Sequence, residues 1–176
     1  MTAPPPTEHS RLVDAQFGPR AAAYVESSVH AGGEDLDQLE ARAQALRPRH
    51  ALDLGCGGGH VSYRLARHAA AVTACDLSAE MLTAVSATAR SRDLSCIATV
   101  QARAQALPFA NAHFDFLACR FSAHHWSALD AGLHEARRVL QPGAAAIFID
   151  AISPGVPLLD THLQAVELLR DPSHAR

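Results

Sequence analysis

The stretch Ala51-Leu52-Asp53-Leu54-Gly55-Cys56-Gly57-Gly58-Gly59 decides the fold, because a short apolar run ends there in a cluster of glycines. A buried strand that turns directly into a helix needs positive φ angles and a backbone without side chains where a ligand approaches, and glycine provides both. The stretch therefore predicts a strand, a ligand-binding turn and the start of a helix. A glycine-rich turn can also serve packing alone, so the surrounding sequence has to support the ligand.

Apolar strands and helices alternate along the chain beyond this turn. Strands separated by helices pair in parallel through right-handed crossovers, which place helices on both faces of one sheet. The sequence therefore predicts an α/β fold, a doubly wound, mostly parallel, Rossmann-like sheet of about five strands. The expected strands cover residues 50–54, 71–76, 95–100, 114–119 and 145–150, and the expected helices cover residues 35–46, 61–69, 78–92, 128–140 and 158–170.

A carboxylate closes the second expected strand. Asp76 follows the glycine turn by about twenty residues, where an acid can accept both hydrogen bonds of a ribose diol. The dinucleotide fingerprint also needs a third glycine, and the bulky His60 at that position disfavours NAD or FAD. An NAD-dependent oxidoreductase is also disfavoured because the chain has no Tyr-x-x-x-Lys pair. S-adenosylmethionine has no pyrophosphate: its carboxylate needs only backbone N–H groups at a helix start, and Asp53 can attract its ammonium group.

Several separate motifs resemble one known family, the class I S-adenosylmethionine-dependent methyltransferases. Within that family the chain is similar to the ubiquinone/menaquinone C-methyltransferase (methyltransferase type 11) group, from about Gln16 to the end. The resemblance implies S-adenosylmethionine as cofactor and methyl transfer to a small-molecule acceptor. The motifs that carry it are Leu52 to Gly59, Asp76 to Leu82, Ala106 to Phe109 with Phe114-Asp115, and Arg137 to Gly143.

The resemblance also implies a set of cofactor-binding residues. Leu77 and Met81 would flank the adenine. Arg103-Ala104 stands where the family commonly has Asp-Ala, and because arginine has only donors, it can stack on the adenine but cannot accept from its amino group. Arg120 is either a further cofactor contact or a surface charge. The predicted set is Asp53, Gly55, Cys56, Gly57, Gly59, Asp76, Leu77, Met81, Arg103, Ala104, Arg120, Phe17 and Tyr24.

The residues before the glycine turn are expected to form a separate layer. Residues 1–8 are rich in proline and predict a disordered lead-in, whereas residues 9–176 predict a single methyltransferase domain. Within it, residues 9–47 are expected to be a helical lid and residues 48–176 the cofactor-binding core. Phe17 and Tyr24 either cover the cofactor from this lid or anchor its helices on the sheet.

His124 and His125 follow the fourth strand, at the edge of the sheet where ligands of open α/β sheets gather. Methyl transfer needs a base only if the acceptor must lose a proton, and a histidine near neutral pH can be that base. The two histidines are therefore candidate catalytic residues, with packing and capping as the alternative.

The end of the chain departs from the family pattern, in which two more strands follow the fifth. The chain stops at Arg176, so the fifth strand is expected to be a sheet edge that can pair with another chain. The protein is then a truncated product, a homodimer joined at that edge, or a domain awaiting a partner. A cofactor-binding but inactive methyltransferase-like protein is the corresponding alternative to an enzyme.

Composition limits the possible partners. The 176 residues contain 15 Lys+Arg against 18 Asp+Glu without a basic cluster, so nucleic acid is not an expected partner. No apolar stretch is long enough to span a membrane, and no leader is apparent. The four separated cysteines are typical of a reducing compartment, which predicts a cytoplasmic protein. No metal site is predicted, because the histidines lack ligand spacing.

Overall fold

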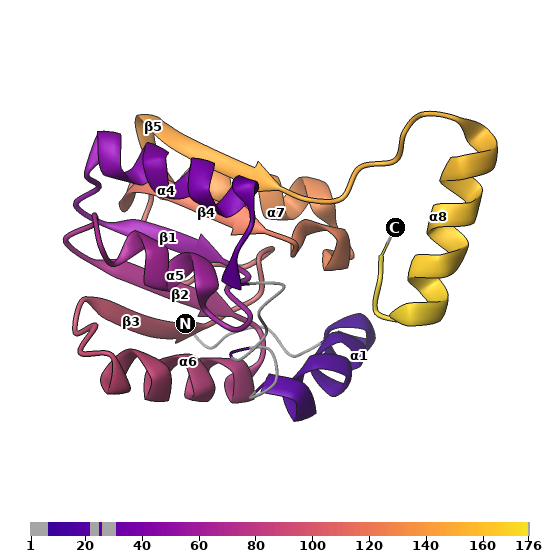
Figure 1. Ribbon diagram of the computed structural model, residues 1–176, viewed down its shortest axis with the longest axis horizontal. Coiled ribbons are helices and arrows are strands. Elements are labelled where there is room, and N and C mark those ends of the chain that lie inside the picture. The colour runs from indigo at the N-terminus through magenta and orange to yellow at the C-terminus, as the bar shows by residue number, and fades with distance from the viewer. Residues whose placement is uncertain (1–6, 22–24, 26–30, 176) are drawn as a thin grey trace.

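The computed structural model describes residues 7–21, 25 and 31–175. Within them, five strands form one sheet in the order β3-β2-β1-β4-β5, and all neighbouring strands are parallel (Figure 1). This confirms the predicted doubly wound α/β fold. The strands are β1 (Ala51–Leu54), β2 (Val72–Asp76), β3 (Ile97–Gln101), β4 (Phe114–Arg120) and β5 (Leu140–Ile149).

The helices follow the expected alternation. Between strands lie α5 (His60–Leu65), α6 (Ala79–Ser91) and, after the short η2 (Ala123–His125), α7 (Leu129–Val139). The connection from β3 to β4 contains no helix. The elements outside the sheet are α1 (Glu8–Phe17), η1 (Gly18–Arg20), α4 (Glu34–Leu46) and α8 (Pro157–Arg170).

Several predicted boundaries were wrong; the helix expected over residues 61–69, for example, ends at Leu65. Glu8 was expected in a disordered lead-in, but it opens α1, whereas residues 1–6 lie outside the described part of the chain. β5 begins at Leu140, earlier than expected, and takes in the predicted turn at Pro142-Gly143. A register irregularity absorbs those residues, because Phe114 pairs with Leu140 while Phe116 pairs with Ala145. Proline is tolerated there because it lies at a bulge of an edge strand.

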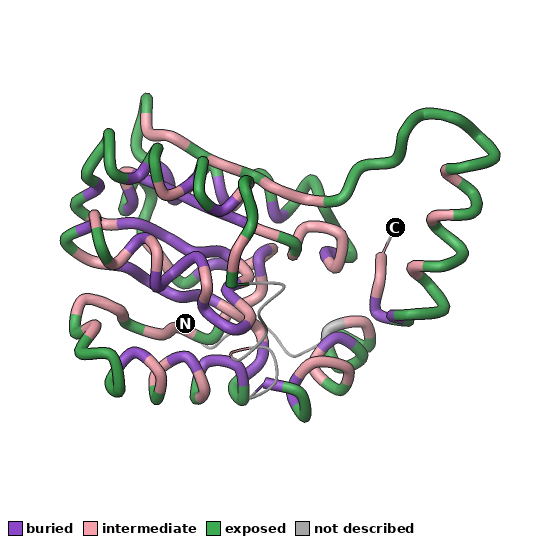
Figure 2. Tube along the Cα trace, viewed as in Figure 1, coloured by how far each residue is buried: buried purple, intermediate pink, exposed green. Residues whose placement is uncertain are grey.

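Each face of the sheet has its own apolar core. On one face, Leu36 and Leu39 of α4 and Leu65 of α5 pack against side chains of β1, β2 and β4 that include Val72 and Phe116. The opposite face is covered by α7 and by the segment before β4, whose apolar side chains include Leu107, Trp126 and Val139. Because both faces are covered, the central strands are almost entirely buried (Figure 2).

The carboxyl ends of the strands face α1 and the end of the chain (Figure 1). α8 stands away from the sheet and contains no buried residue, as its exposed trace in Figure 2 shows. The following tail, residues 171–175, returns to η2, where Ala175 N donates to His124 O at 2.8 Å and the Ser173 side chain is buried. None of the described helices is both long and apolar enough to cross a membrane.

Candidate functional site

The glycine turn after β1 has the backbone conformation that its sequence predicts. Gly55, Gly57 and Gly59 have φ angles of 75°, 47° and 80°. A Cβ on Gly55 would lie 1.9 Å from Ser122 Oγ, whereas a Cβ on Gly57 would meet nothing within 4 Å. Gly55 is therefore required by close packing, and Gly57 leaves an open position at the turn. Gly59 is different again, because it packs against Tyr63 and is absent from the walls of both cavities described below.

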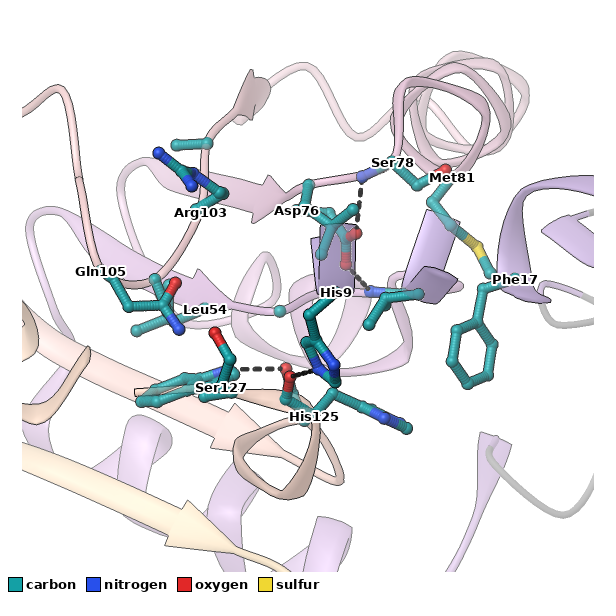
Figure 3. A pocket seen from close by; sticks show the side chains of 18 of the residues that line it. His9, Phe17, Leu54, Asp76, Ser78, Met81, Arg103, Gln105, His125 and Ser127 are labelled. Atoms are coloured by element: carbon teal, nitrogen blue, oxygen red, sulfur yellow. Dashed lines mark hydrogen bonds between the residues drawn. The ribbon is translucent and has the colours of Figure 1, made fainter. Parts of the chain in front are cut away.

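Asp76 holds this turn together from the end of β2. Its Oδ2 accepts a hydrogen bond from Gly57 N at 2.8 Å, and its Oδ1 accepts one from Ser78 N at 3.0 Å (Figure 3). Partial removal from water raises the pKa of Asp76, and the hydrogen bonds from these backbone amides oppose that rise. The carboxylate is oriented toward the mouth of the glycine turn, and each oxygen keeps a lone pair for a further donor.

Asp53 is the buried acid on β1, with 1% of its surface exposed. Ser62 Oγ donates to its Oδ2 at 2.6 Å, while its Oδ1 is buried and has no hydrogen-bond partner among the described residues. Burial raises the pKa of Asp53 to about 7. An unpartnered carboxylate oxygen beside an open backbone turn is suited to a cationic group of a ligand.

A first cavity of about 290 Å³ lies between the glycine turn, the start of α6 and α1. Its walls are mainly apolar, with Leu54, Met81 and Trp126 among them, and Asp76 and Arg103 add charge (Figure 3). This combination is typical of small-molecule sites. Of the predicted residues, this cavity brings together Phe17, Gly55, Gly57, Asp76, Leu77, Met81, Arg103 and Ala104.

A second cavity of about 350 Å³ lies on the other side of the glycine turn. Phe17, Gly55, Gly57, Phe121 and His125 line both cavities, so the two spaces adjoin at the turn. The second cavity adds the predicted residues Asp53, Cys56, Arg120 and His124. Tyr24, also predicted for this region, lies outside the described residues.

Arg120 is held by an ion pair. Its Nε lies 2.5 Å from Asp35 Oδ2 and its Nη2 lies 3.3 Å from Asp35 Oδ1, which joins the end of β4 to the start of α4. The pKa of Asp35 is lowered by this guanidinium. Because only 6% of the Arg120 side chain is exposed, its interpretation as a surface charge was wrong. Arg120 instead lines the second cavity.

The two candidate catalytic histidines have different surroundings. His124 Nδ1 lies 2.6 Å from Asp150 Oδ1, at the ends of the neighbouring strands β4 and β5. His125 is held by the tail, with Nδ1 3.3 Å from Ser173 O and Nε2 3.7 Å from Asp171 Oδ2. Burial, followed by the charge of His124, lowers the pKa of His125 to about 4. Among the described residues, no group of three or more His, Cys, Asp or Glu side chains is placed to hold a metal ion.

Sequence reasoning missed several residues of the site. Asp150 directly follows β5, and only the pairing of β5 with β4 brings it near His124. Phe121 has a φ of 52°, and such unusual backbone conformations gather at functional sites, but the sequence carries no sign of it. Ser122 and Trp126 line the first cavity, and Trp126 Nε1 donates to Ser122 Oγ at 3.3 Å. His9 reaches the site from α1, where its Nε2 contacts His125 O at 2.8 Å (Figure 3).

Comparisons with known proteins agree on one family. A family model described as a methyltransferase domain matches residues 52–148. The Escherichia coli protein YafE is 46% identical over 122 residues, which cover 69% of this chain and 59% of YafE. A ubiquinone/menaquinone biosynthesis C-methyltransferase from Paracoccus denitrificans is 32% identical over 155 residues, which cover 84% of this chain and 62% of that protein.

Solved structures agree with the observed fold. The crystal structure of YcgJ from Bacillus subtilis superposes with a TM-score of 0.77 and 30% identity, covering 81% of this chain and 61% of that one. The chain thus spans roughly three fifths of the length of these relatives.

Proposed function

The chain belongs to the methyltransferase domain family, and from this premise we propose that it binds S-adenosylmethionine across the two cavities and transfers the methyl group to a small-molecule acceptor. When bound, the cofactor supplies a methyl group on a positively charged sulfur. The observation that carries the proposal is the open position at Gly57, which lies between the buried acid Asp53 and the oriented acid Asp76.

The charges at the turn fit this cofactor's chemistry. Asp76 can accept from the ribose hydroxyls, and the unpartnered oxygen of Asp53 can accept from the ammonium group. The residue at the third glycine position of a dinucleotide site is His60, which opens α5 and disfavours a pyrophosphate there. The residues therefore fit S-adenosylmethionine better than NAD or FAD.

The apolar part of the first cavity suits an adenine ring. Leu77 and Met81 line it beside Arg103 and Ala104. Arg103 cannot accept from the adenine amino group, so we propose that its guanidinium stacks on the ring.

Residues of α1 complete the enclosure. Val13 and Phe17 line the first cavity, which supports the lid role proposed for residues 9–47. Excluding water while donor and acceptor are held in line is the main task of the protein in methyl transfer. For Tyr24, outside the described residues, the lid proposal predicts that Tyr24→Ala weakens S-adenosylhomocysteine binding without unfolding the protein; unchanged calorimetric affinity would remove it from the lid.

The cofactor proposal is tested by calorimetric titration with S-adenosylhomocysteine and, separately, with NADH. We expect only the first to bind, and Asp76→Ala to weaken it at least about 100-fold, because hydrogen bonds to a charged group contribute about 1.5–3 kcal/mol each. Asp130→Ala, at an exposed position on α7, is the matched control. NADH binding, or full affinity in Asp76→Ala, would contradict the proposal.

We also propose that the protein forms a homodimer through β5. This strand is an edge of the sheet, and Phe148 on it is 41% exposed. Light scattering over a range of concentrations tests this, and a monomer at every concentration would exclude it.

The alternative of a cofactor-binding protein without activity requires that S-adenosylhomocysteine binds but no acceptor is methylated.

We also propose a cytoplasmic location. Cys56, Cys75, Cys96 and Cys119 are all free thiols in the structure, which supports a reducing environment. Localisation of a tagged full-length protein by cell fractionation tests it.

A further inference from the structure

The geometry points to His124, oriented by Asp150, as the general base of the proposed methyl transfer, so that the acceptor is a small molecule whose reacting oxygen or carbon must lose a proton. This inference rests on the proposed function and adds to it the chemical class of the acceptor: acidic hydroxyls, such as phenols, and carbons activated by neighbouring carbonyl groups.

Two hydrogen bonds fix the pair. The ring atom Nδ1 of His124 lies 2.6 Å from Asp150 Oδ1, and the backbone N of His124 donates to Asp150 Oδ2 at 3.2 Å. Ala151 N also donates to Asp150 Oδ1, at 2.9 Å. Burial raises the pKa of Asp150, but its hydrogen bonds to His124 and Ala151 outweigh this and lower it, so the carboxylate stays ionised. An ionised carboxylate only accepts, and Nδ1 must therefore carry the proton, which leaves Nε2 as the basic atom.

The pair is placed beside the cofactor region. His124 and Asp150 line the second cavity together with Asp53, Gly55 and Gly57. Among the described residues, no hydrogen bond engages His124 Nε2. His124 thus lines the cavity that adjoins the proposed cofactor site, with its basic atom outside any hydrogen bond among the described residues.

His125 does not share this arrangement. It packs against Phe17 with ring centroids 5.0 Å apart, and its ring nitrogens face Ser173 and Asp171 of the tail. It therefore links the tail and α1 to η2. We assign His125 a positioning role and His124 the catalytic one.

The tail also orients the base. His174 stacks on His124 with ring centroids 4.4 Å apart and an angle of 16° between the planes, while Ala175 N donates to His124 O. One face of the His124 ring is covered in this way, and Asp150 fixes its edge. The imidazole is held before any acceptor enters, which is the condition for efficient proton transfer.

The step balances in atoms and charge. The proton of the acceptor's O–H or C–H passes to His124 Nε2, and the electron pair left on oxygen or carbon forms the new bond to the methyl group. The electron pair of the broken sulfur–methyl bond stays on sulfur, which becomes a neutral thioether. The imidazolium formed is stabilised by Asp150 and returns its proton to solvent.

The first test is spectroscopic and needs no turnover. In the full chain with ¹⁵N-labelled histidine, NMR should show His124 protonated at Nδ1, and Asp150→Asn should abolish that preference. A His124 protonated at Nε2 in the neutral form would overturn the inference.

The second test separates this inference from cofactor binding. Calorimetric affinity for S-adenosylhomocysteine should change less than about twofold in His124→Gln, because the base acts on the acceptor and glutamine keeps a polar side chain at this part of the cavity wall. Transfer of labelled methyl groups is then measured for a panel of phenols, β-dicarbonyl compounds and amines. We expect transfer to the first two classes, with kcat at least about 100-fold lower in His124→Gln and KM nearly unchanged. His134→Gln, an exposed histidine on α7, should behave as wild type.

The outcomes distinguish the two proposals. Full activity of His124→Gln would overturn the general base while leaving cofactor binding intact. Methylation of amines alone, or no transfer to any of the three classes by a protein that binds S-adenosylhomocysteine, would overturn the proposed acceptor class. Absence of S-adenosylhomocysteine binding would overturn the proposed function and this inference with it.

Discussion

The glycine-turn region, residues 51–76, and the end of the chain, residues 150–175, contribute to the same site in opposite ways. In the first, Asp53 lies within the buried strand β1, Asp76 ends the neighbouring strand β2, and backbone amides orient Asp76. In the second, α8 buries no residue, and the tail is held by polar and ring contacts to His124 and His125. The comparison indicates that the proposed cofactor half is part of the core, whereas the proposed acceptor half is attached to it by a few contacts.

The largest expected effect concerns the buried acid of the first region. The folded state raises the pKa of Asp53 from 3.8 to about 7, so its burial costs stability progressively as pH rises from 3.8 through 7. Asp53→Asn removes this cost and should raise the free energy of unfolding at pH 8 by at most about 4 kcal/mol, because the hydrogen bond from Ser62 loses its charged acceptor in the same variant. Urea denaturation at pH 8 measures it. The same variant should bind S-adenosylhomocysteine more weakly, because the ammonium group loses its anion.

The control for this prediction is the exposed Asp37→Asn on α4, whose stability should stay within about 0.5 kcal/mol of wild type. If Asp53→Asn is no more stable than wild type at pH 8, the Asp53 carboxylate is well solvated. The glycine-turn region would then not differ from the chain end in being part of the buried core.

The next effect separates two glycines of the turn. Gly55→Ala should lose about 3 kcal/mol of stability, because the left-handed φ adds strain and the new Cβ meets Ser122 Oγ. Gly57→Ala has open space and should lose only about 1 kcal/mol, yet bind S-adenosylhomocysteine at least about tenfold more weakly, because its methyl group enters the cavity. Denaturation and calorimetry measure the two quantities.

Gly155→Ala supplies the matched control, since Gly155 has the same φ of 75° as Gly55 and open space around its Cβ position, in the loop before α8. Gly155→Ala should lose about as much stability as Gly57→Ala, because both adopt a left-handed φ, but it should bind S-adenosylhomocysteine with unchanged affinity. Equal stability losses for the Gly55 and Gly57 variants would mean that the approach of Ser122 is not a constraint.

A smaller effect tests the attachment of the chain end. The folded state lowers the pKa of His125 from 6.5 to about 4, so the protein loses stability as pH falls from about 6.5 to 4. His125→Asn should remove this loss. Between pH 6.5 and pH 4, the variant should therefore gain about 2 kcal/mol of unfolding free energy relative to wild type. This value is smaller than the full pKa shift implies, because the side chain keeps some contact with water.

The comparison has to be made between variant and wild type, because Asp53 titrates in the opposite direction over the same pH range and partly cancels the effect of His125 in the wild-type curve. A difference in unfolding free energy that does not change with pH would indicate that the His125 ring is exposed to water rather than buried.

The smallest expected effect is on the tail itself. His174→Ala removes the stacking on His124 and should cost about 0.5 kcal/mol. Hydrogen exchange of residues 171–175 should become faster, while exchange in β1 stays unchanged. His162→Ala, an exposed histidine on α8, should alter neither. Equally slow exchange of the tail in both variants would mean that other contacts hold it.

Most of the fold could be predicted because its determinants are local. The alternation of apolar strands and helices specified the parallel sheet. The glycine run and Asp76 specified the turn, because these residues lie at the ends of their own strands. The start of β5 was missed because Pro142-Gly143 reads as a turn, and only pairing with β4 draws it into the strand as a bulge.

The sequence by itself thus determined the sheet, the glycine turn and the family, because repeating patterns and short motifs record backbone requirements directly. Only the tertiary structure decided which side chains meet: Ser122 against Gly55, Asp35 on Arg120, and Asp150 on His124 rather than on His125. These partners are far apart in the chain, and whether they meet depends on strand order, register and the path of the tail, which no local pattern encodes.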